Sequence, residues 1–309
     1  MKAIQMKSYG GADVLSYDEV PTPEPQSDEI LIRIHAAPIN PIDWKIREGY
    51  MQNWLPLQLP LIPGSEFAGV VAAVGANVQA FQAGEEIYGY SSLLRGGAYA
   101  EFIVVKETEI AAKPNNIDFV HAAAIPVGAL TALQAFDLTG LSAGQTVLIH
   151  AAAGGVGSMA VQIAKARGAH VIGTASARNA DFVKSLGADE VIDYTMTKFE
   201  DVVKDVDVVF DLVGGDTQAR SFGVLKAGGW LVSAVSPPAP EESEQHGVKS
   251  AMITVQPNAA ELKKVTALVE AGQLKTFVET VLPLSAARQA HDLSQSGRTR
   301  GKIVLQVVQ

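Results

Sequence analysis

A run of small residues between an apolar strand and a helix is the segment of this sequence best suited to hold phosphate. Residues 147–150 are apolar apart from His150, and residues 151–157 follow them as Ala-Ala-Ala-Gly-Gly-Val-Gly. The first amides of a helix lack partners within it and lie at the positive end of its dipole, so they suit a pyrophosphate. Glycine at 154 lets the backbone approach the phosphates, and glycine at 157 lets the helix pack on the strand. We therefore predict dinucleotide contacts at Ala153, Gly154, Gly155, Val156 and Gly157.

The end of the next expected strand indicates which dinucleotide this is. An acidic residue there would bind the ribose 2′-hydroxyl of NAD, but residues 173–179 contain no acid and offer Ser176 and Arg178. A hydroxyl and a guanidinium together suit a 2′-phosphate, so we predict NADPH as the cofactor. Tyr194, after the third strand, is expected at the same phosphate. The alternatives are that Arg178 is a solvated residue at a helix start and that Tyr194 is an ordinary surface tyrosine.

Strands and helices alternate around these residues. Between about residues 119 and 258, apolar strands alternate with helical segments such as 156–167 and 180–186. Such alternation predicts βαβ units and a doubly wound Rossmann sheet of parallel strands, and it favours a dinucleotide site over a plain strand–helix connection at 151–157. The segment 236–245, rich in Pro and Glu, is expected to be a mobile loop beside the sheet.

The parts of the chain before and after this region have a different pattern. Residues 2–113 are strand-like and rich in turns, with alternation at 30–35 and an apolar run at 67–74. Residues 259–270 are amphipathic and two strand-like segments follow them, so we assign the last part to the first lobe. The expected α/β organisation has a β-rich domain at 1–118, a dinucleotide-binding domain at 119–258, a return to the first domain at 259–309, and a cleft shared by two lobes.

The composition is that of a globular protein and narrows the chemistry. The 309 residues are 48% hydrophobic and 18% charged, and no run approaches the ~20 apolar residues that span a bilayer. No signal-peptide pattern follows Met1, so the cytoplasm is the expected location. The formal net charge of −9 argues against non-specific binding of nucleic acid. The absence of cysteine excludes disulfides, thiolate catalysis and cysteine-ligated metal sites.

Several further motifs are spread over nearly the whole chain. They are Ala-Pro-Ile-Asn-Pro-Ile-Asp at 37–43, Pro-Gly-Ser-Glu-Phe-Ala-Gly at 63–69, Gly-Gly-Ala-Tyr-Ala-Glu-Phe at 96–102, Ile-Pro-Val-Gly-Ala-Leu-Thr-Ala at 125–132, Ala-Asp-Glu-Val-Ile-Asp-Tyr at 188–194 and Arg-Gly-Lys-Ile-Val-Leu at 300–305. With Ala-Ala-Gly-Gly-Val-Gly at 152–157, they resemble the medium-chain dehydrogenases/reductases, in the zinc-free, quinone reductase-like group. The resemblance implies a GroES-like catalytic domain beside the Rossmann domain.

The resemblance also bears on metal chemistry. Zinc-dependent relatives place a Cys early in the first lobe and a His before the glutamate of a Gly-His-Glu motif. This chain has Asn-Pro-Ile-Asp at 40–43 and Gly-Ser-Glu at 64–66, and it lacks the cysteine-rich structural-zinc lobe. Without a metal to hold an alkoxide, alcohol dehydrogenation is not expected. Hydride transfer from nicotinamide to an electron-poor acceptor, such as a quinone or an activated alkene, needs no metal.

Three residues of the first lobe are implied as catalytic by the resemblance. It places Asn40 and Asp43 at the mouth of the nicotinamide pocket and makes Tyr50 a hydrogen-bond donor to the acceptor oxygen. Asn40 and Asp43 equally fit a turn before a short helix and an acid that caps it. Tyr50 equally fits a partly exposed aromatic residue in a loop.

Three residues of the Rossmann region are further expected cofactor contacts. Thr131, in Gly-Ala-Leu-Thr, resembles the position whose hydroxyl faces the nicotinamide in this family. The alternative is a helix threonine bonded to its own backbone. The other two expected contacts are Val213 and Val235.

The remaining polar and aromatic candidates are expected to be structural. Glu66 is predicted to make structural hydrogen bonds, and His35 and His150 to be core histidines. The basic run at 298–302 is expected on a solvated face, with a contact from one arginine to the cofactor phosphate as the alternative. The leucines around Trp54 are expected to pack in the core, and Trp54 itself to face the substrate.

Three functions remain open from the sequence. The first is an NADPH:quinone oxidoreductase, and the second is an enone, enal or enoyl-thioester reductase that uses the same cofactor site with another pocket. The third is a non-catalytic NADPH-binding protein with a structural, regulatory or RNA-associated role, which the acidic charge disfavours for RNA. The family also implies a homodimer, for which the strand at 251–255 offers an edge.

Overall fold

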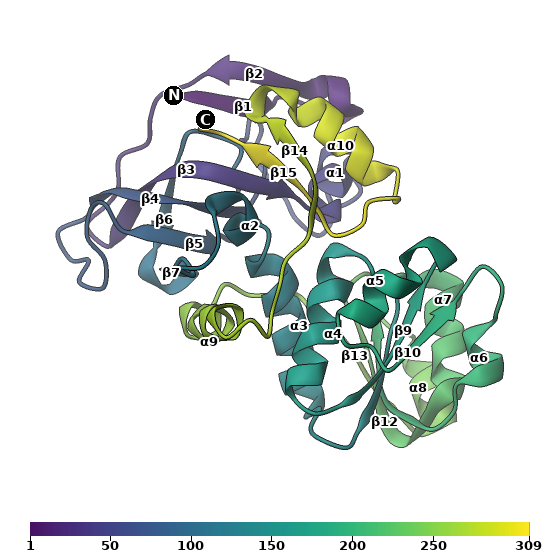
Figure 1. Cartoon of the computed structure of the whole chain (residues 1–309). Coiled ribbons are helices and arrows are strands. Elements are labelled where there is room, and N and C mark those ends of the chain that lie inside the picture. The colour runs from purple at the N-terminus through teal and green to yellow at the C-terminus, as the bar shows by residue number, and fades with distance from the viewer. Residues whose placement is uncertain (309) are drawn as a thin grey trace. The chain divides into compact units, whose positions relative to one another are not determined.

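The computed structural model describes residues 1–308, which form two compact units. The chain begins in the first unit and returns to it for its C-terminal part. The first unit contains Met1–Val127, Pro257–Ala271 and the chain from Thr276 onward, and the second contains Gly128–Gln256 with Gly272–Lys275. Figure 1 labels most of the helices and strands of both.

Six parallel strands form the sheet of the second unit. They are β8 (Thr146–Ile149), β9 (His170–Ala175), β10 (Glu190–Asp193), β11 (Val206–Asp211), β12 (Leu225–Ser233) and β13 (Lys249–Met252). Their order is β10-β9-β8-β11-β12-β13, which is 3-2-1-4-5-6 when the strands are counted along this unit. This is the strand order of a Rossmann sheet, so the predicted doubly wound fold is confirmed.

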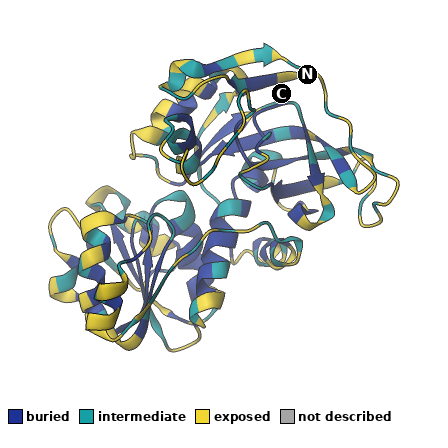
Figure 2. Cartoon of the chain, turned by 180° about the vertical axis from the view of Figure 1, so that it is seen from behind, coloured by how far each residue is buried: buried dark blue, intermediate teal, exposed yellow. Residues whose placement is uncertain are grey.

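Helices connect these strands and lie on both sides of the sheet (Figure 1). They are α3 (Pro126–Thr139), α4 (Gly155–Ala166), α5 (Ala180–Ser185), α6 (Phe199–Val202), α7 (Gly215–Ser221) and α8 (Pro240–His246). Helices on both faces bury the sheet, which is why all six residues of β11 are buried and apolar ones predominate in β8 and β11. Strands β8, β9 and β11 are mostly buried and dark blue in Figure 2, and the outer sides of the helices are yellow.

The first unit is built around a mixed sheet of seven strands. Six follow the order β14-β15-β3-β4-β5-β7, and β6 pairs with β3. These strands are β3 (Glu29–Ile39), β4 (Glu66–Val74), β5 (Glu86–Tyr90), β6 (Phe102–Lys106), β7 (Ile110–Ala112), β14 (Val278–Pro283) and β15 (Lys302–Gln306). The other elements are the hairpin β1 (Lys2–Met6) and β2 (Leu15–Glu19), and the helices α1 (Pro41–Arg47), α2 (Phe119–Ala123), α9 (Ala259–Glu270) and α10 (Ala287–Gln295).

Alternation of side chains explains how the long strand β3 organises this unit. Ile30, Ile32 and Ile34 are fully buried, while Arg33 between them is exposed, as a period of two requires. β3 pairs with β4 and β6 along its first part and with β15 near its end, so it holds the start of α1 beside the C-terminal strand. This pairing brings residues 40 and 302 together.

The expectation of a mobile loop at 236–245 is wrong, because helix α8 occupies most of it. Pro240 stands at the first helical position, where its missing N–H costs nothing, and Glu241 and Glu242 lie in the first turn, where the helix dipole favours acids. Gly247 ends the helix in a left-handed conformation with φ of 62°. The Pro and Glu content that suggested a loop is therefore the start signal of a short helix.

The expectation that no apolar stretch approaches membrane-spanning length also needs correction. The stretch Phe119–Thr139, which contains α2 and α3, is long and apolar enough by composition to cross a membrane. Of its apolar window, 72% is buried inside the protein. Core helices of globular proteins have the same length and composition, so this stretch is weak evidence for a membrane span.

Candidate functional site

The turn between β8 and α4 has the geometry of a phosphate-binding loop. Ala151 has a left-handed φ of 49°, and Gly154 caps α4, which starts at Gly155. A Cβ on Gly157 would lie 2.2 Å from the carbonyl oxygen of Ala151, so only glycine lets the helix pack this close to the strand. Amides of the first turn of α4 have no partners within the helix, and a pyrophosphate of a dinucleotide fits them.

The residues expected at a 2′-phosphate lie after the two neighbouring strands. Ser176 is half-buried and Arg178 is exposed, both just beyond the end of β9. Tyr194 follows β10, has 62% of its surface exposed, and donates its main-chain N–H to the carbonyl of Ala175 (3.3 Å). Asp193 at the end of β10 is engaged by the N–H and hydroxyl of Thr195 at 3.0 and 2.7 Å. The structure thus places Ser176, Arg178 and Tyr194 at one edge of the sheet.

The other expected cofactor residues follow the remaining strands at the same edge. Val213 is exposed after β11 and Val235 is half-buried after β12. Asp211, which the sequence analysis missed, ties these ends together, since its buried carboxylate accepts the N–H of Val213 and of Gly214 and the hydroxyl of Ser233 at 2.8–2.9 Å. Its signal was an acid at the end of an apolar strand.

Thr131 lies on α3, whose start packs against the start of α4. It is buried, with 4% of its surface exposed. Gly128, one turn earlier on α3, is close to Gly155, because a Cβ on Gly128 would lie 3.0 Å from the Gly155 carbonyl oxygen. Thr131 is therefore on the helix next to the phosphate-binding turn, as a cofactor contact requires.

A buried polar frame in the first unit connects α1, β4 and β15. The ammonium of Lys302 donates to Glu66 Oε2 (2.8 Å) and to Asn40 Oδ1 (2.6 Å), and Asn40 Nδ2 donates to Glu66 Oε2 (3.0 Å). The other carboxylate oxygen of Glu66 accepts the N–H of Val127 (2.7 Å). Glu66 is fully buried and Lys302 is 4% exposed, so the two charges neutralise each other away from water.

Asp43 extends this frame towards Tyr99. Its Oδ2 accepts the hydroxyl of Tyr99 (2.6 Å) and the main-chain N–H of Asn40 (2.7 Å). Burial raises the pKa of Asp43 from its ordinary 3.8 to about 6, although these hydrogen bonds and Lys302 oppose the shift. Tyr99 packs on Gly64, where a Cβ would lie 2.3 Å from the ring. Asp43 also accepts from the residue that precedes α1, so the alternative of a helix-cap acid describes its local structure.

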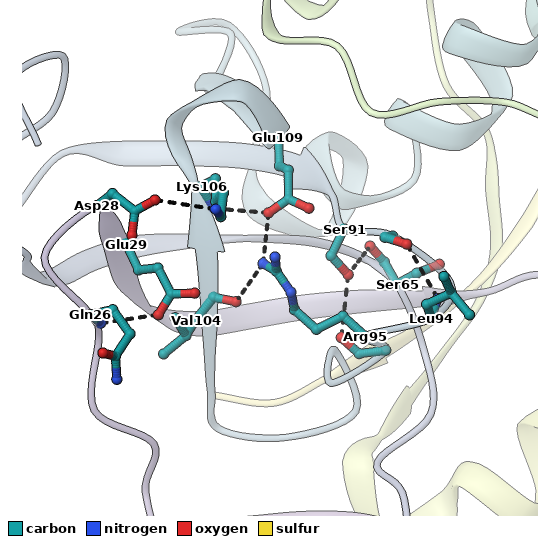
Figure 3. A network of polar contacts seen from close by, with 12 residues as sticks. Gln26, Asp28, Glu29, Ser65, Ser91, Leu94, Arg95, Val104, Lys106 and Glu109 are labelled. Carbon is teal, nitrogen blue, oxygen red and sulfur yellow. Dashed lines mark hydrogen bonds and ion pairs between the residues drawn. The ribbon is translucent and has the colours of Figure 1, made fainter. Parts of the chain in front are cut away.

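Ser65 sits between Gly64 and Glu66 on a rigid backbone. Its carbonyl accepts the N–H and the hydroxyl of Ser91 at 2.7 and 3.2 Å (Figure 3). The hydroxyl of Ser65 itself is buried, and among residues 1–308 it has no hydrogen-bond partner. The loop that carries Ser91 is fastened by Arg95, whose guanidinium donates to Glu109 (2.8 Å) and to the carbonyl of Val104 (3.2 Å).

Comparison with known proteins connects both regions to one family. Residues 26–115 match the alcohol dehydrogenase GroES-like domain and residues 186–305 match the zinc-binding dehydrogenase model. The chain is 37% identical to the chloroplast envelope quinone oxidoreductase homolog of Arabidopsis thaliana, over 99% of this chain and 98% of that protein. The chain belongs to the medium-chain dehydrogenase/reductase family, in its quinone oxidoreductase branch.

Two further relatives bear on cofactor and acceptor. The crystal structure of Escherichia coli quinone oxidoreductase complexed with NADPH matches with a TM-score of 0.91 and 32% identity, over 99% of this chain and all of that one. A chloroplastic NADPH-dependent alkenal/one oxidoreductase of Arabidopsis thaliana is 38% identical over 99% of this chain and 79% of that protein. This chain is therefore an NAD(P)-dependent oxidoreductase of the medium-chain fold.

The zinc that one matching model is named for does not fit the residues at this place. Asn40 and Ser65 stand where zinc-dependent members have Cys and His, and the ammonium of Lys302 already occupies Asn40 Oδ1 and Glu66. A second cation beside it would be repelled, and the amide and hydroxyl are poor zinc ligands. Among residues 1–308, no group of three or more His, Asp or Glu side chains is arranged to hold a metal ion.

The other candidates of the first unit are placed as follows. Tyr50 is 65% exposed and packs edge-on against Trp44 (centroids 6.1 Å apart), and Trp54 is 75% exposed. The structure does not bring Tyr50 into the polar frame of Asn40 and Asp43, so it fits the alternative of a partly exposed loop aromatic. The leucines near Trp54 pack against the core, as expected.

Two predictions about structural residues need correction. Lys302 is buried in the frame rather than on a solvated face, because it starts a strand of the sheet and meets the buried Glu66. His35 is only half-buried, stacked on Phe119 at 4.2 Å, whereas His150 is a core histidine bonded to Thr174 and Ser221. Burial lowers the pKa of His150 to about 4, so the expectation for His150 is confirmed.

Proposed function

We propose that this protein is an NADPH-dependent reductase that transfers a hydride to a quinone or another electron-poor acceptor without using zinc. The cofactor supplies the hydride when bound. The protein binds and orients the two reactants and stabilises the negative charge that develops on the acceptor. The residues we propose as catalytic are Asn40 and Asp43, which share the buried polar frame.

The carboxyl edge of the Rossmann sheet carries this proposal. The segments that follow strands β8 to β12 each carry at least one expected cofactor residue at that edge. They run from the turn at 153–157 to Val235. Ser176 and Arg178 stand where an acid would select NAD, and the one acid of the adjacent strand end, Asp193, is engaged by Thr195. A 2′-phosphate would gain a hydroxyl and a guanidinium there, which supports NADPH over NADH.

Two acceptor classes are supported by the names of relatives. Quinones are named for the Arabidopsis thaliana and Escherichia coli proteins, and alkenals or alkenones for another relative. Both classes accept a hydride at a carbon conjugated to a carbonyl, so one cofactor site serves either. Rates of NADPH oxidation with matched panels of quinones and enones decide between them.

Replacement of Arg178 tests the cofactor. We expect Arg178→Ala to weaken NADPH binding by about 1–3 kcal/mol, the cost of a lost charge-assisted hydrogen bond, and to leave NADH binding unchanged. Titration calorimetry with both cofactors measures this. Arg33→Ala, at an exposed position of β3 in the other unit, is the matched control. Equal losses for NADPH and NADH would refute the 2′-phosphate role.

A homodimer is proposed on the edge of the same sheet. Among residues 1–308, strand β13 pairs with β12 on one side only, so the other side of Lys249–Met252 presents main-chain groups without a strand partner. A second copy of the chain would pair with that edge. Sedimentation of the protein and of Met252→Pro, which removes a main-chain donor that faces away from β12, distinguishes a dimer from a monomer.

A further inference from the structure

A cavity of about 750 Å³ lies within the first unit. This is the size of sites that enclose small organic molecules. It is bounded by the N-terminal strand, the loop at 56–65, the loop at 93–97 and strand β6. Much of the wall is apolar, with side chains such as Leu57, Leu61, Leu93 and Phe102. Such a wall suits a ligand with an apolar body.

Two residues with buried polar side chains, Asp43 and Ser65, are also among the residues that line this cavity. Ser65 has 2% of its surface exposed, and within the described chain its hydroxyl lacks a partner. A buried hydroxyl without a hydrogen bond destabilises a protein, so such a group indicates that something outside the chain satisfies it. The backbone around Ser65 is fixed, because Ser91 holds its carbonyl and the neighbouring Glu66 is held by Lys302.

The charges around the cavity define the ligand further. The pKa of Asp43, about 6, leaves its carboxylate mostly charged at neutral pH, which repels an anionic group. Arg95, a basic lining residue, is paired with Glu109 (2.8 Å), and the N-terminal ammonium of Met1 donates to the carbonyl of Val20 (2.7 Å), so both cations already have partners in the chain. The cavity therefore suits a neutral molecule that presents a hydrogen-bond-accepting oxygen to Ser65.

We propose that this cavity binds the electron acceptor, a neutral and largely apolar quinone or α,β-unsaturated carbonyl compound, and that the Ser65 hydroxyl donates a hydrogen bond to its carbonyl oxygen. This rests on the proposed function. The acceptor receives a hydride at the conjugated carbon, and the π-electron pair moves onto the carbonyl oxygen. Ser65 stabilises the resulting oxyanion and keeps its own proton, and water supplies the proton that completes the reduction. NADPH, acceptor and one proton thus give NADP⁺ and the reduced acceptor.

Substitutions at two lining positions, Ser65 and Gln58, test the cavity without altering the cofactor-binding unit. Ser65→Ala removes the hydroxyl and is expected to lower kcat/KM for the acceptor by about 10²-fold, as loss of an oxyanion donor does. Ser65→Thr keeps a hydroxyl and should retain more activity than alanine. Gln58→Phe, at an exposed position of the lining, should raise the acceptor KM by blocking the cavity. Ser285→Ala, exposed in the same unit and absent from the lining, is the matched control.

Binding is measured as well as turnover. Quenching of tryptophan fluorescence by 2-methyl-1,4-naphthoquinone, in protein without cofactor, should weaken in Ser65→Ala and Gln58→Phe and stay unchanged in Ser285→Ala. The Kd for NADPH should be the same in all four proteins. The proposal would be overturned if the wild-type enzyme is active and the cavity variants keep its acceptor KM and its affinity for the naphthoquinone. The proposed function would then remain intact. Wild-type protein that neither binds NADPH nor oxidises it would overturn the proposed function itself.

Discussion

The two polar regions of this molecule are made in different ways. The carboxyl edge of the Rossmann sheet consists mainly of backbone, and its central turn is one contiguous segment, residues 151–157. The frame of the first unit consists of side chains, and its bond from Lys302 to Asn40 joins residues 262 positions apart. The backbone site requires glycine where a Cβ would clash with neighbouring main chain. The side-chain site requires that each buried charge is neutralised by an opposite one. Each dependence predicts a different kind of sensitivity to mutation.

The largest effect is expected where the buried charge balance is broken. Lys302→Met leaves Glu66 fully buried without its cation and Asn40 without a donor. Removing one partner of a buried pair typically costs about 3–5 kcal/mol. We expect a loss of that size in the free energy of unfolding, measured by urea denaturation.

The control for this experiment is an exposed ion pair in the same unit. Lys2 and Glu19 are 3.3 Å apart with side chains 47% and 77% exposed, so Lys2→Met should cost less than about 1 kcal/mol. Glu66→Gln added to Lys302→Met should recover part of the loss, because it removes the uncompensated charge. Equal stability of Lys302→Met and Lys2→Met would show that the frame does not rely on charge balance.

A smaller effect is expected when a methyl group is added to the backbone site. In Gly157→Ala the new Cβ would lie 2.2 Å from the Ala151 carbonyl oxygen and 2.8 Å from Ala152 Cα, so α4 must move away from the turn. Overpacking of this kind costs about 1–3 kcal/mol. Affinity for NADPH should fall as well, since the first-turn amides move with the helix.

Gly223→Ala is the matched control, since a Cβ there meets nothing within 4 Å. Urea denaturation and NADPH titration of both variants measure the two effects. An alanine at 157 that binds NADPH as well as the wild type would mean that the turn is not the phosphate site.

The same difference explains what the sequence could predict. Three glycines lie within four residues shortly after an apolar strand, at 154, 155 and 157. The motif, the helix start and the need for glycine could therefore be inferred from local residues. Strand–helix alternation likewise predicted the doubly wound parallel sheet of the second unit. The family resemblance added the GroES-like fold of the first unit. Asn40 and Asp43 were identified only through that resemblance.

The partners of the frame could not be predicted, because they depend on strand pairing across the chain. Lys302 lies in a basic run that is typical of a surface, and only the pairing of β15 with β3 turns it inward. Tyr99 and Ser65 carry no local signal for their buried contacts. The helix α8 was missed for another reason, because Pro and Glu are typical of both loops and helix starts. Gly247, which ends the helix in a left-handed conformation, is the further helix signal in this segment.

The smallest effect is expected from a single hydrogen bond within the frame. The pKa of Asp43 is raised above its ordinary 3.8 to about 6, so the folded protein binds this proton more tightly than the unfolded chain. The contribution of Asp43 to stability is therefore greatest below about pH 4 and declines as the pH rises to about 6. Above about pH 6 the contribution of Asp43 to stability no longer changes with pH. Asp43→Asn, which cannot titrate, provides the flat reference for this profile.

Tyr99→Phe sharpens the contrast, because it removes one side-chain donor and no charge. The Tyr99 hydroxyl lowers the pKa of Asp43 by donating to Oδ2, so its loss should raise that pKa above about 6 and extend the decline in stability to higher pH. One unit of pKa corresponds to about 1.4 kcal/mol, and we expect a change of roughly that size or less. The free energy of unfolding from pH 4 to 8, relative to Asp43→Asn, measures it. A profile that ends at the same pH as the wild type would mean that the hydroxyl does not hold the carboxylate, and that the frame of the first unit ends at Asn40, Glu66 and Lys302.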